Sequence, residues 1–271
     1  MSIPEMFCRS EQCSEGLAAR LKYFYATTPD YDAFQTPSNQ TLLWAHLALA
    51  IRERLKVASN RKLRGLEVGS GRSGLPTYIK AQGLQEHVEL FAQDVTAQNA
   101  PWLEEHFDSV IIAGIESLRG EFDAVIGSYV FEHITSPRRF LGTLVNLLAP
   151  GGCLLMTCPR YDLPFYLSRS ADHLSPARRL ATGCYLLWCR LLTIATGRAA
   201  WLVHRDPAVF HLPFHPDRDA VHWVSWFDIR AEWPSATKLV LGAGGFRDWV
   251  SKKLLTAGFK IPAPDRATVP C

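Results

Sequence analysis

The sequence lacks a strong excess of charge of either sign. Its 271 residues include 29 Lys and Arg and 26 Asp and Glu, which leaves a net charge of +3. So small an excess does not indicate nucleic-acid binding, and no separate basic module is visible, so we expect no nucleic-acid partner. Hydrophobic residues make up 48% of the chain. That share is enough to bury a full core and excludes a globally disordered protein.

The sequence also lacks a long hydrophobic run. The longest stretch without charge, residues 140–159, is split by Pro150-Gly151-Gly152 and is not typical of a membrane span. Charged residues at positions 5, 9, 11 and 15 interrupt any secretory signal. We therefore expect a cytoplasmic protein.

The seven cysteines do not form a recognisable pattern of pairs. Their number is odd and no C-x-x-C occurs, which favours free thiols in a reducing compartment. Cys153 and Cys158 lie five positions apart on a predicted strand. They should therefore point to opposite faces and not pair with each other.

Short apolar segments alternate with helical ones from residue 63 onward. Strands are predicted over residues 63–68, 87–93, 109–113, 122–128 and 153–158, with a helix over 136–148. This alternation is typical of an α/β protein. It predicts a doubly wound, Rossmann-like, mostly parallel sheet with helices on both faces.

The segments around this core, residues 61–159, are predicted to play other parts. Residues 1–60 are expected to form an N-terminal helical cap, with helices over 11–25 and 38–57 and Ser38 as an N-cap. Residues 160–240 lose the alternation, and we interpret them as a large irregular insertion, or lid, after the fifth strand. Residues 241–271 are predicted to complete the core with a helix over 245–257 and a strand over 258–261.

The most informative segment is LEVGSGRSG, residues 66–74, which runs from a predicted strand into a helix. Gly69 and Gly71 allow a sharp turn and close approach of a ligand. Glu67 places a carboxylate at the end of its strand. Asp94 ends the next strand, where a carboxylate can accept hydrogen bonds from both hydroxyls of a ribose. Because Glu67 would repel a pyrophosphate, the pattern indicates a nucleoside ligand with a cationic amino-acid part.

Four ordered segments together resemble the class I S-adenosylmethionine-dependent methyltransferases. They are LEVGSGRSG, AQDVT (92–96), FDAVIGSYVFEHI (122–134) and LLAPGGCLLMTCP (147–159), with a weaker match in LLTAGFKI (254–261). The resemblance implies a Rossmann-like fold, S-adenosylmethionine as cofactor and methyl transfer as the reaction.

The resemblance also implies ten cofactor-binding residues. They are Glu67 for the amino end, Gly69, Ser70 and Gly71 along the cofactor, Asp94 for the ribose, Val95, Ile115 and Glu116 around the adenine, and Ser128 and Tyr129 beside the sulfonium. Two positions depart from the family pattern. Ser73 replaces its usual third glycine, and Gly114 stands where an Asp usually contacts the adenine amino group.

Three histidines are candidate catalytic bases, because a hydroxyl acceptor benefits from a base near the working pH. His133 follows the fourth strand, and the alternative is that it braces the following loop. His215 and His222 belong to a segment, residues 211–223, that concentrates His, Asp and Arg. The alternatives for this segment are a solvated loop with paired charges and a divalent-metal site. Its spacing matches no zinc signature, so no metal is predicted.

Residues 173–205 contain five Arg and no acid, interleaved with Leu and Trp. They predict either a basic lid or a helix in peripheral contact with an anionic membrane. The alternative is an ordinary helix pair with its Arg head groups in water. Trp223 and Trp226 are expected either to stack on an acceptor ring or to belong to the core.

The sequence therefore predicts a methyltransferase that acts on a small molecule or glycan, at oxygen, with residues 160–240 forming the acceptor site. The competing hypothesis is an S-adenosylmethionine-binding protein without methyl transfer, which the departures at Ser73 and Gly114 would fit. RNA methylation is disfavoured, because SYVFEH replaces the Asn/Asp-Pro-Pro-aromatic motif after the fourth strand. The oligomeric state is left open.

Overall fold

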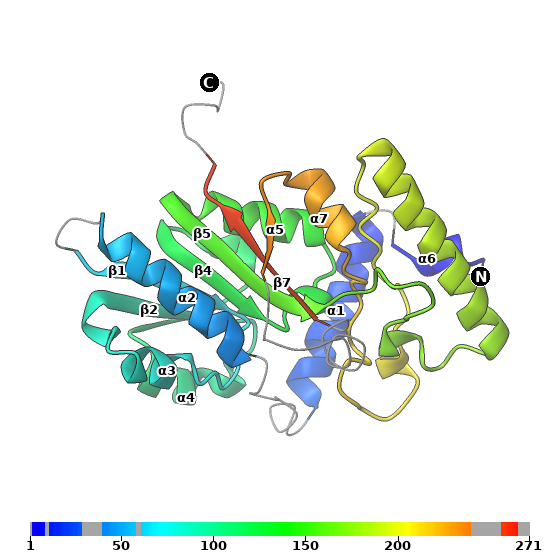
Figure 1. Cartoon of the computed structure of the whole chain (residues 1–271). Helices are drawn as coiled ribbons and strands as arrows, with labels where there is room; N and C mark the ends of the chain where they lie inside the picture. The colour runs from blue at the N-terminus through cyan, green and yellow to red at the C-terminus, as the bar shows by residue number, and fades with distance from the viewer. Residues whose placement is uncertain (1, 9–10, 29–39, 58–60, 240–255, 265–271) are drawn as a thin grey trace.

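A seven-stranded sheet forms the centre of the computed structural model, which describes residues 2–8, 11–28, 40–57, 61–239 and 256–264 (Figure 1). The strands are β1 (Leu63–Val68), β2 (Val88–Asp94), β3 (Ser109–Ile112), β4 (Phe122–Ser128), β5 (Leu148–Pro159), β6 (Thr237–Leu239) and β7 (Thr256–Pro262). Their order is β3-β2-β1-β4-β5-β7-β6. Neighbours among β1 to β5 are parallel, and β7 is antiparallel to β5 and β6. The predicted doubly wound, mostly parallel sheet is confirmed, and its order reverses between β1 and β4.

Helices cover both faces of the sheet, as predicted. The described α-helices are α1 (Glu11–Thr27), α2 (Gln40–Leu55), α3 (Leu75–Ala81), α4 (Ala100–His106), α5 (Pro137–Asn146), α6 (Pro176–Thr196) and α7 (Trp226–Glu232). One core layer joins α5 and α7 to Leu66 and Val68 of β1. The other joins α2, α3 and α4 to Leu63 of the same strand. Cys153 and Cys158 fall into opposite layers and are both free thiols, so that prediction is confirmed.

Strand β5 begins earlier than the predicted residue 153. Leu148 already pairs with Phe122, and the register then shifts before Cys153 pairs with Ala124. Gly152 lies at this irregularity, where a Cβ would come within 2.8–3.0 Å of three backbone carbonyl oxygens. The Pro-Gly-Gly segment therefore passes through the strand as an irregularity and does not stop it.

Residues 160–240 are not irregular throughout, which corrects the sequence interpretation. They contain the 21-residue helix α6, helix α7 and strand β6 at the edge of the sheet. Helix α6 begins after Ser175, whose side chain accepts from the backbone N–H of Arg178, and ends at Gly197 with a φ of 66°. A helix within residues 173–205 was among the alternatives, and most large apolar residues of α6 face outward.

The two N-terminal helices cover different parts of the molecule. Helix α2 packs on the sheet. Helix α1 packs through Leu17 and Leu21 on residues of the insertion. Just before α1, Phe7 forms a β-bridge with His204. The insertion is thus held by the N-terminal segment as well as by the sheet.

Cys8 and Cys13 form a disulfide, which corrects the expectation of free thiols only. The backbone N–H of Cys8 donates to the carbonyl of Val203 at 2.8 Å, while Cys13 lies in the first turn of α1. These two anchors place the Cα atoms 5.6 Å apart, within the range of a disulfide. Cys184 and Cys189, like the pair on β5, are free.

Two predictions fall wholly or mostly on positions that the structure does not describe. Ser38, the predicted N-cap, and residues 245–255 of the last predicted helix lie outside the described residues. Residues 256 and 257 begin β7, so the helix prediction was wrong there. Among the described helices, none combines the length and the apolar character required to cross a membrane.

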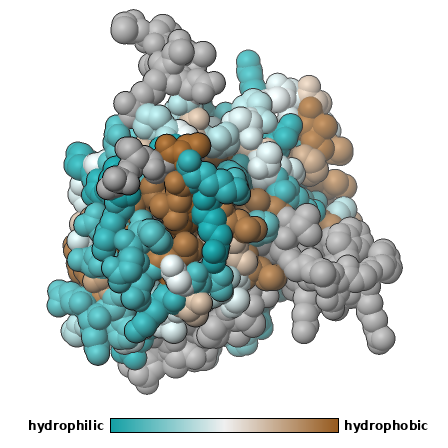
Figure 2. All heavy atoms as spheres, turned by 60° about the vertical axis from the view of Figure 1, so that its left-hand side comes forward, coloured by the Kyte–Doolittle hydropathy of each residue, from teal (hydrophilic) through white to brown (hydrophobic). Residues whose placement is uncertain are grey.

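A hollow of about 410 Å³ lies between α2 and the sheet, lined in part by Leu49, Val57 and Lys260. Figure 2 turns this side forward and shows apolar side chains gathered among hydrophilic ones. The hollow borders the amino ends of β1 and β4, whereas ligands of doubly wound sheets bind at the carboxyl ends. None of the ten cofactor-binding candidates lines it.

Candidate active site

The glycine-rich loop after β1 adopts a conformation that only glycine tolerates easily. Gly69 and Gly71 have φ angles of 59° and 49°. A Cβ on Gly69 would lie 2.6 Å from Cγ2 of Val130, so the loop also passes close to the segment after β4. Ser70 is held in this turn because its hydroxyl donates to the carbonyl of Glu67 at 2.8 Å. The loop therefore presents backbone rather than side chains at the carboxyl end of β1.

Glu67 is a buried acid with one unused oxygen. Its Oε1 accepts a hydrogen bond from Ser73 Oγ at 3.0 Å, and its Oε2 has no partner. Burial raises the pKa of Glu67 to about 8, against the lowering effect of the Ser73 hydroxyl. A buried carboxylate oxygen without a partner fits the cationic amino end of S-adenosylmethionine.

Ser73, which replaces the usual third glycine of the family pattern, has a structural role that the sequence did not predict. Besides donating to Glu67, its Oγ accepts from the backbone N–H of Leu75 at 3.1 Å. The hydroxyl thus connects the buried acid to the start of α3.

Asp94 lies at the end of β2, as predicted, and ties the glycine-rich loop to this strand. Its Oδ2 accepts from the backbone N–H of Gly71, and its Oδ1 from that of Thr96, both at 3.0 Å. Oδ1 also accepts from the Thr96 hydroxyl at 3.4 Å, so Oδ2 offers the second lone pair that a ribose hydroxyl can use. The sugar contact was predicted from the sequence, whereas this loop-bracing role was not.

The residues expected around the adenine differ in exposure. Val95 is 48% exposed and Glu116 is exposed, whereas Ile115 packs in the core. The side chain of Gln93, which was not among the predicted site residues, joins two loops here. It accepts from the backbone N–H of Gly69 at 3.2 Å and donates to the carbonyl of Ala113 at 2.6 Å.

Ser128 and Tyr129 end β4 beside the glycine-rich loop. The Ser128 hydroxyl is buried without a partner. Tyr129 has a φ of 55°, uncommon for a side-chain-bearing residue, and its N–H donates to the carbonyl of Thr157 at 2.8 Å. Strained residues of this kind concentrate at functional sites. Together with the free oxygen of Glu67, the Ser128 hydroxyl gives the carboxyl end of the sheet polar atoms that fit S-adenosylmethionine.

His133 follows these residues and pairs with an acid from the insertion. Its Nδ1 lies 3.1 Å from Oδ2 of Asp219, which also accepts from the hydroxyl of Tyr25 at 3.0 Å. Burial disfavours the imidazolium, but the charge and hydrogen bond of Asp219 outweigh it and raise the pKa of His133 to about 10. Residues from the segment after β4, from α1 and from the insertion therefore meet at this point.

Glu132, next in sequence, is fully buried, and neither of its carboxyl oxygens has a partner. Burial raises its pKa to about 8. The acceptor side therefore contains a carboxyl group that stays largely neutral at pH 7, beside the charged pair of His133 and Asp219.

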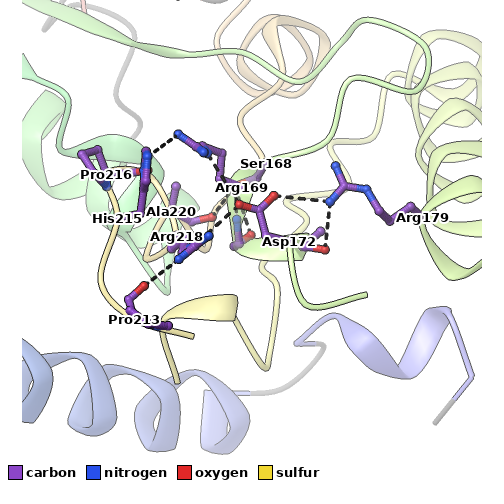
Figure 3. Close-up of polar contacts among 11 residues, drawn as sticks. Ser168, Arg169, Asp172, Arg179, Pro213, His215, Pro216, Arg218 and Ala220 are labelled. Carbon is purple, nitrogen blue, oxygen red and sulfur yellow. Dashed lines mark hydrogen bonds and ion pairs between the residues drawn. The ribbon is translucent and has the colours of Figure 1, made fainter. Parts of the chain in front are cut away.

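His215 lies in a basic cluster of the insertion (Figure 3). The Arg169 guanidinium lies 3.2 Å from its Nε2, and its Nδ1 lies 3.1 Å from the carbonyl of Pro216. Since a guanidinium only donates, Nε2 accepts and the proton is on Nδ1. Arg169, Arg179 and Arg218 all lie within 3.6 Å of the carboxylate of Asp172. The basic nitrogen of His215 is therefore already engaged.

His222 and Trp223 belong to the core. His222 is fully buried, and its Nδ1 lies 3.0 Å from the carbonyl oxygen of Phe131. Burial lowers its pKa to about 3, so the ring is neutral. Trp223 is also fully buried, which decides between the two roles left open for it. This placement favours packing over proton transfer for His222.

Among the described residues, one group offers three ligands to a metal ion: His173, Asp206 and His211. Their ligand atoms lie within 4.8 Å of one another, and no sequence pattern had grouped them. However, His211 Nε2 already lies 2.7 Å from Asp206, and the Arg20 guanidinium lies 3.7 Å from the same carboxylate. The nearby cation opposes a second positive charge.

Comparisons with known proteins agree with this geometry. A family model described as a methyltransferase domain matches residues 43–235. No curated protein sequence matches the chain significantly. Several solved structures are similar to it, and the values in parentheses are the sequence identity, the shares of this chain and of that chain covered, and the TM-score. One is a Burkholderia thailandensis 1,6-didemethyltoxoflavin-N1-methyltransferase with 1,6-didemethyltoxoflavin and S-adenosylhomocysteine bound (13%, 93% and 91%, 0.52). Another is the plantazolicin methyltransferase BamL with a triazolic desmethylPZN analog and SAH (12%, 94% and 99%, 0.51). A third is the CurJ carbon methyltransferase (15%, 82% and 54%, 0.49).

The two structures with TM-scores above 0.5 show the shared fold. The family model spans more than half of the chain, and its match includes the glycine-rich loop, Asp94 and His133. The chain therefore belongs to the methyltransferase-domain family and is an S-adenosylmethionine-dependent class I methyltransferase.

Proposed function

We propose that the protein methylates an oxygen atom of a small molecule or glycan that binds beneath residues 160–240. The observation that carries this proposal is the pair of His133 and Asp219, whose Nδ1 and Oδ2 atoms lie 3.1 Å apart. His133 follows Ser128 and Tyr129 at the end of β4, where the reacting methyl group is expected. A small acceptor is supported by the way α1 and the insertion meet over this end of the sheet.

The pair has the arrangement of a general base and its orienting acid. When bound, S-adenosylmethionine supplies an electrophilic methyl group. Asp219 accepts from Nδ1–H of His133, which leaves Nε2 as the atom that takes the proton of an acceptor hydroxyl. Oxygen is favoured as the acceptor atom because a hydroxyl must lose this proton. The competing hypothesis of a protein without methyl transfer rested in part on Ser73. That residue holds Glu67 and the start of α3 in place, so it gives this hypothesis no support.

Only neutral His133 can act as the base, and Asp219 raises its pKa to about 10. We therefore expect kcat/KM to rise with pH between about 7 and 10, as the imidazolium loses its proton. Asp219→Asn removes the negative charge and should shift the midpoint down towards the ordinary histidine value of about 6.5. His133→Gln should lower kcat by about 100-fold or more.

The test begins with labelled S-adenosylmethionine and a panel of sugars, lipid-linked glycans and phenols, followed by pH–rate profiles on the best acceptor. Asp206→Asn, an acid of the insertion outside the pair, serves as the control and should leave the profile unchanged. Methylation only at nitrogen or carbon, or only of protein or nucleic acid, would contradict the proposal. Equal profiles for wild type and Asp219→Asn would remove the base from the mechanism.

A further inference from the structure

Helix α6 presents an apolar face to the outside of the molecule. Leu180, Trp188 and Ile194 are 60%, 58% and 57% exposed. The other exposed positions from 181 to 197 are Ala181, Cys184, Leu187, Leu191, Leu192, Ala195, Thr196 and Gly197. None of these residues carries a charge, and many recur at the three- and four-residue spacing of one helix face.

The opposite face of α6 is the more polar one. Thr182, Arg190 and Thr193 are buried, and Arg190 Nη1 donates to Asp228 of α7 at 2.6 Å. The buried arginine also corrects the interpretation that all Arg head groups of this segment lie in water. A helix on a protein surface normally turns its polar face to solvent, so the polarity of α6 is inverted. Monomers rarely leave a continuous apolar surface of this kind uncovered.

Basic residues frame this face at both ends. Arg178 and Arg179 lie in the first turn of α6, and Arg198 follows its C-terminal cap. No acidic residue occurs from 173 to 205, and Asp172 just before this segment pairs with Arg179 at 3.3 Å. Phe165, itself half exposed, lies against Gly183 and extends the apolar surface beyond the helix. The partner must therefore be apolar opposite the middle of α6 and negatively charged opposite its ends.

A second copy of the chain does not meet this requirement. Twofold symmetry would place α6 against its own copy, either parallel or antiparallel. In both cases the basic ends of one helix would face the basic ends of the other, with no acid in the segment to compensate. An anionic bilayer offers what the second copy lacks, because acyl chains lie directly beneath a negatively charged surface.

We propose that the outer face of α6 lies in the boundary between the headgroups and acyl chains of an anionic membrane. The helix would lie flat, since its inner face stays bound to the protein through Arg190 and Asp228. Its position at the edge of the molecule, away from the central sheet, leaves it accessible for this contact (Figure 1). The inference goes beyond the proposed methyl transfer and does not depend on which atom is methylated.

The experiment is co-sedimentation of the full chain with vesicles of phosphatidylcholine alone or with about 30% phosphatidylglycerol. Wild type should bind the anionic vesicles, bind the neutral ones more weakly, and be released in part at about 0.5 M salt. Trp188→Glu with Leu191→Glu should weaken binding by about tenfold or more, because two charges replace buried apolar groups. Arg178→Gln with Arg198→Gln should reduce the preference for anionic vesicles. Leu49→Glu on α2 is the control, because Leu49 is 60% exposed but lies outside α6. This substitution should leave vesicle binding unchanged.

Folding of each variant is checked by its melting temperature and its affinity for S-adenosylhomocysteine, which should match those of wild type. If wild type does not bind S-adenosylhomocysteine, the cofactor assignment is contradicted, but the vesicle-binding result still tests the membrane proposal. The proposal is overturned if wild type binds neither vesicle, or if the α6 variants bind as wild type does. It is also overturned if sedimentation velocity shows a dimer that Trp188→Glu with Leu191→Glu dissociates, without vesicle binding.

Discussion

Glu67 illustrates how one buried side chain can make cofactor binding depend on pH. Its pKa is raised to about 8 because burial disfavours the carboxylate, while Oε2 has no partner to stabilise a charge. Below that pH the free protein holds a neutral acid. The cationic amino group of the cofactor interacts more strongly with the ionised form. Binding must therefore include the loss of this proton.

We predict that affinity for S-adenosylhomocysteine rises between about pH 6 and pH 8 as Glu67 ionises. Glu67→Gln should weaken binding by about 1.5–3 kcal/mol, the range for a hydrogen bond to a charged group, and should flatten the pH dependence. Titration calorimetry at three pH values measures both effects. Glu86→Gln, at an exposed acid away from the site, is the control. A pH dependence that survives in Glu67→Gln would assign it to another group.

Helices α6 and α7 are joined by a buried ion pair. Asp228 accepts from Arg190 Nη1 at 2.6 Å, from Thr193 Oγ1 at 3.1 Å and from the backbone N–H of Ala200 at 2.8 Å. The pair holds α6 to the protein through its polar face. Without Asp228, the buried guanidinium would keep only the carbonyl of Trp223 at 2.7 Å and a more distant carboxylate, that of Asp162 at 3.9 Å.

We predict that Asp228→Ala lowers the free energy of unfolding by about 3–5 kcal/mol. Glu232→Ala on the same helix removes a pair with Arg138, which is largely exposed, and should cost less than about 1 kcal/mol. Urea denaturation measures both. Equal losses of unfolding free energy for the two variants would show that the buried pair stabilises the contact between α6 and α7 no more than the exposed pair stabilises its own.

The sequence predicted the strands well and the insertion poorly, for one physical reason. Strands such as residues 63–68 and 122–128 are buried on both faces, so apolar residues predominate in them without strict alternation. Helix α6 does the opposite, because its apolar residues face outward and its buried face contains Arg190. Sequence patterns are interpreted on the assumption that the apolar face of a helix is buried. For α6 this assumption assigns the wrong face to the interior.

The same contrast applies to the site. Glu67 and Asp94 could be predicted because the ends of adjacent parallel strands meet at one edge of the sheet. Asp219 could not be paired with His133, since the two lie 86 residues apart, nor could Tyr25, which is 108 residues away. Such contacts depend on how α1 and the insertion pack, which local sequence does not encode.

At the scale of the whole molecule, five buried groups contribute to the dependence of stability on pH. The pKa values of Glu67 and Glu132 are raised to about 8 and that of His133 to about 10, so the folded state holds their protons longer than the unfolded state. Stability from these groups falls as pH rises, between about 4.5 and 8 for the acids and between about 6.5 and 10 for His133. Burial lowers the pKa values of His204 and His222 to about 3. Their contribution rises with pH from about 3 to 6.5.

We therefore predict a plateau of stability between about pH 4.5 and 6.5, where the two sets oppose each other, and the steepest loss between about 6.5 and 8. Melting temperatures of the cofactor-free protein across this range measure the profile. His133→Gln should reduce the loss above pH 8. A protein that becomes more stable from pH 6.5 to 8 would contradict the assigned ionisation states.

The β-bridge between Phe7 and His204 also has a consequence for biosynthesis. Met6 and Phe7 are buried among residues 161–223, so they leave the ribosome roughly 150 to 220 residues before their packing partners. At about 5–20 residues per second, the delay is on the order of 10–40 s. During that interval the nascent chain carries Met6 and Phe7 without their packing partners, which makes it a candidate client for a ribosome-associated chaperone.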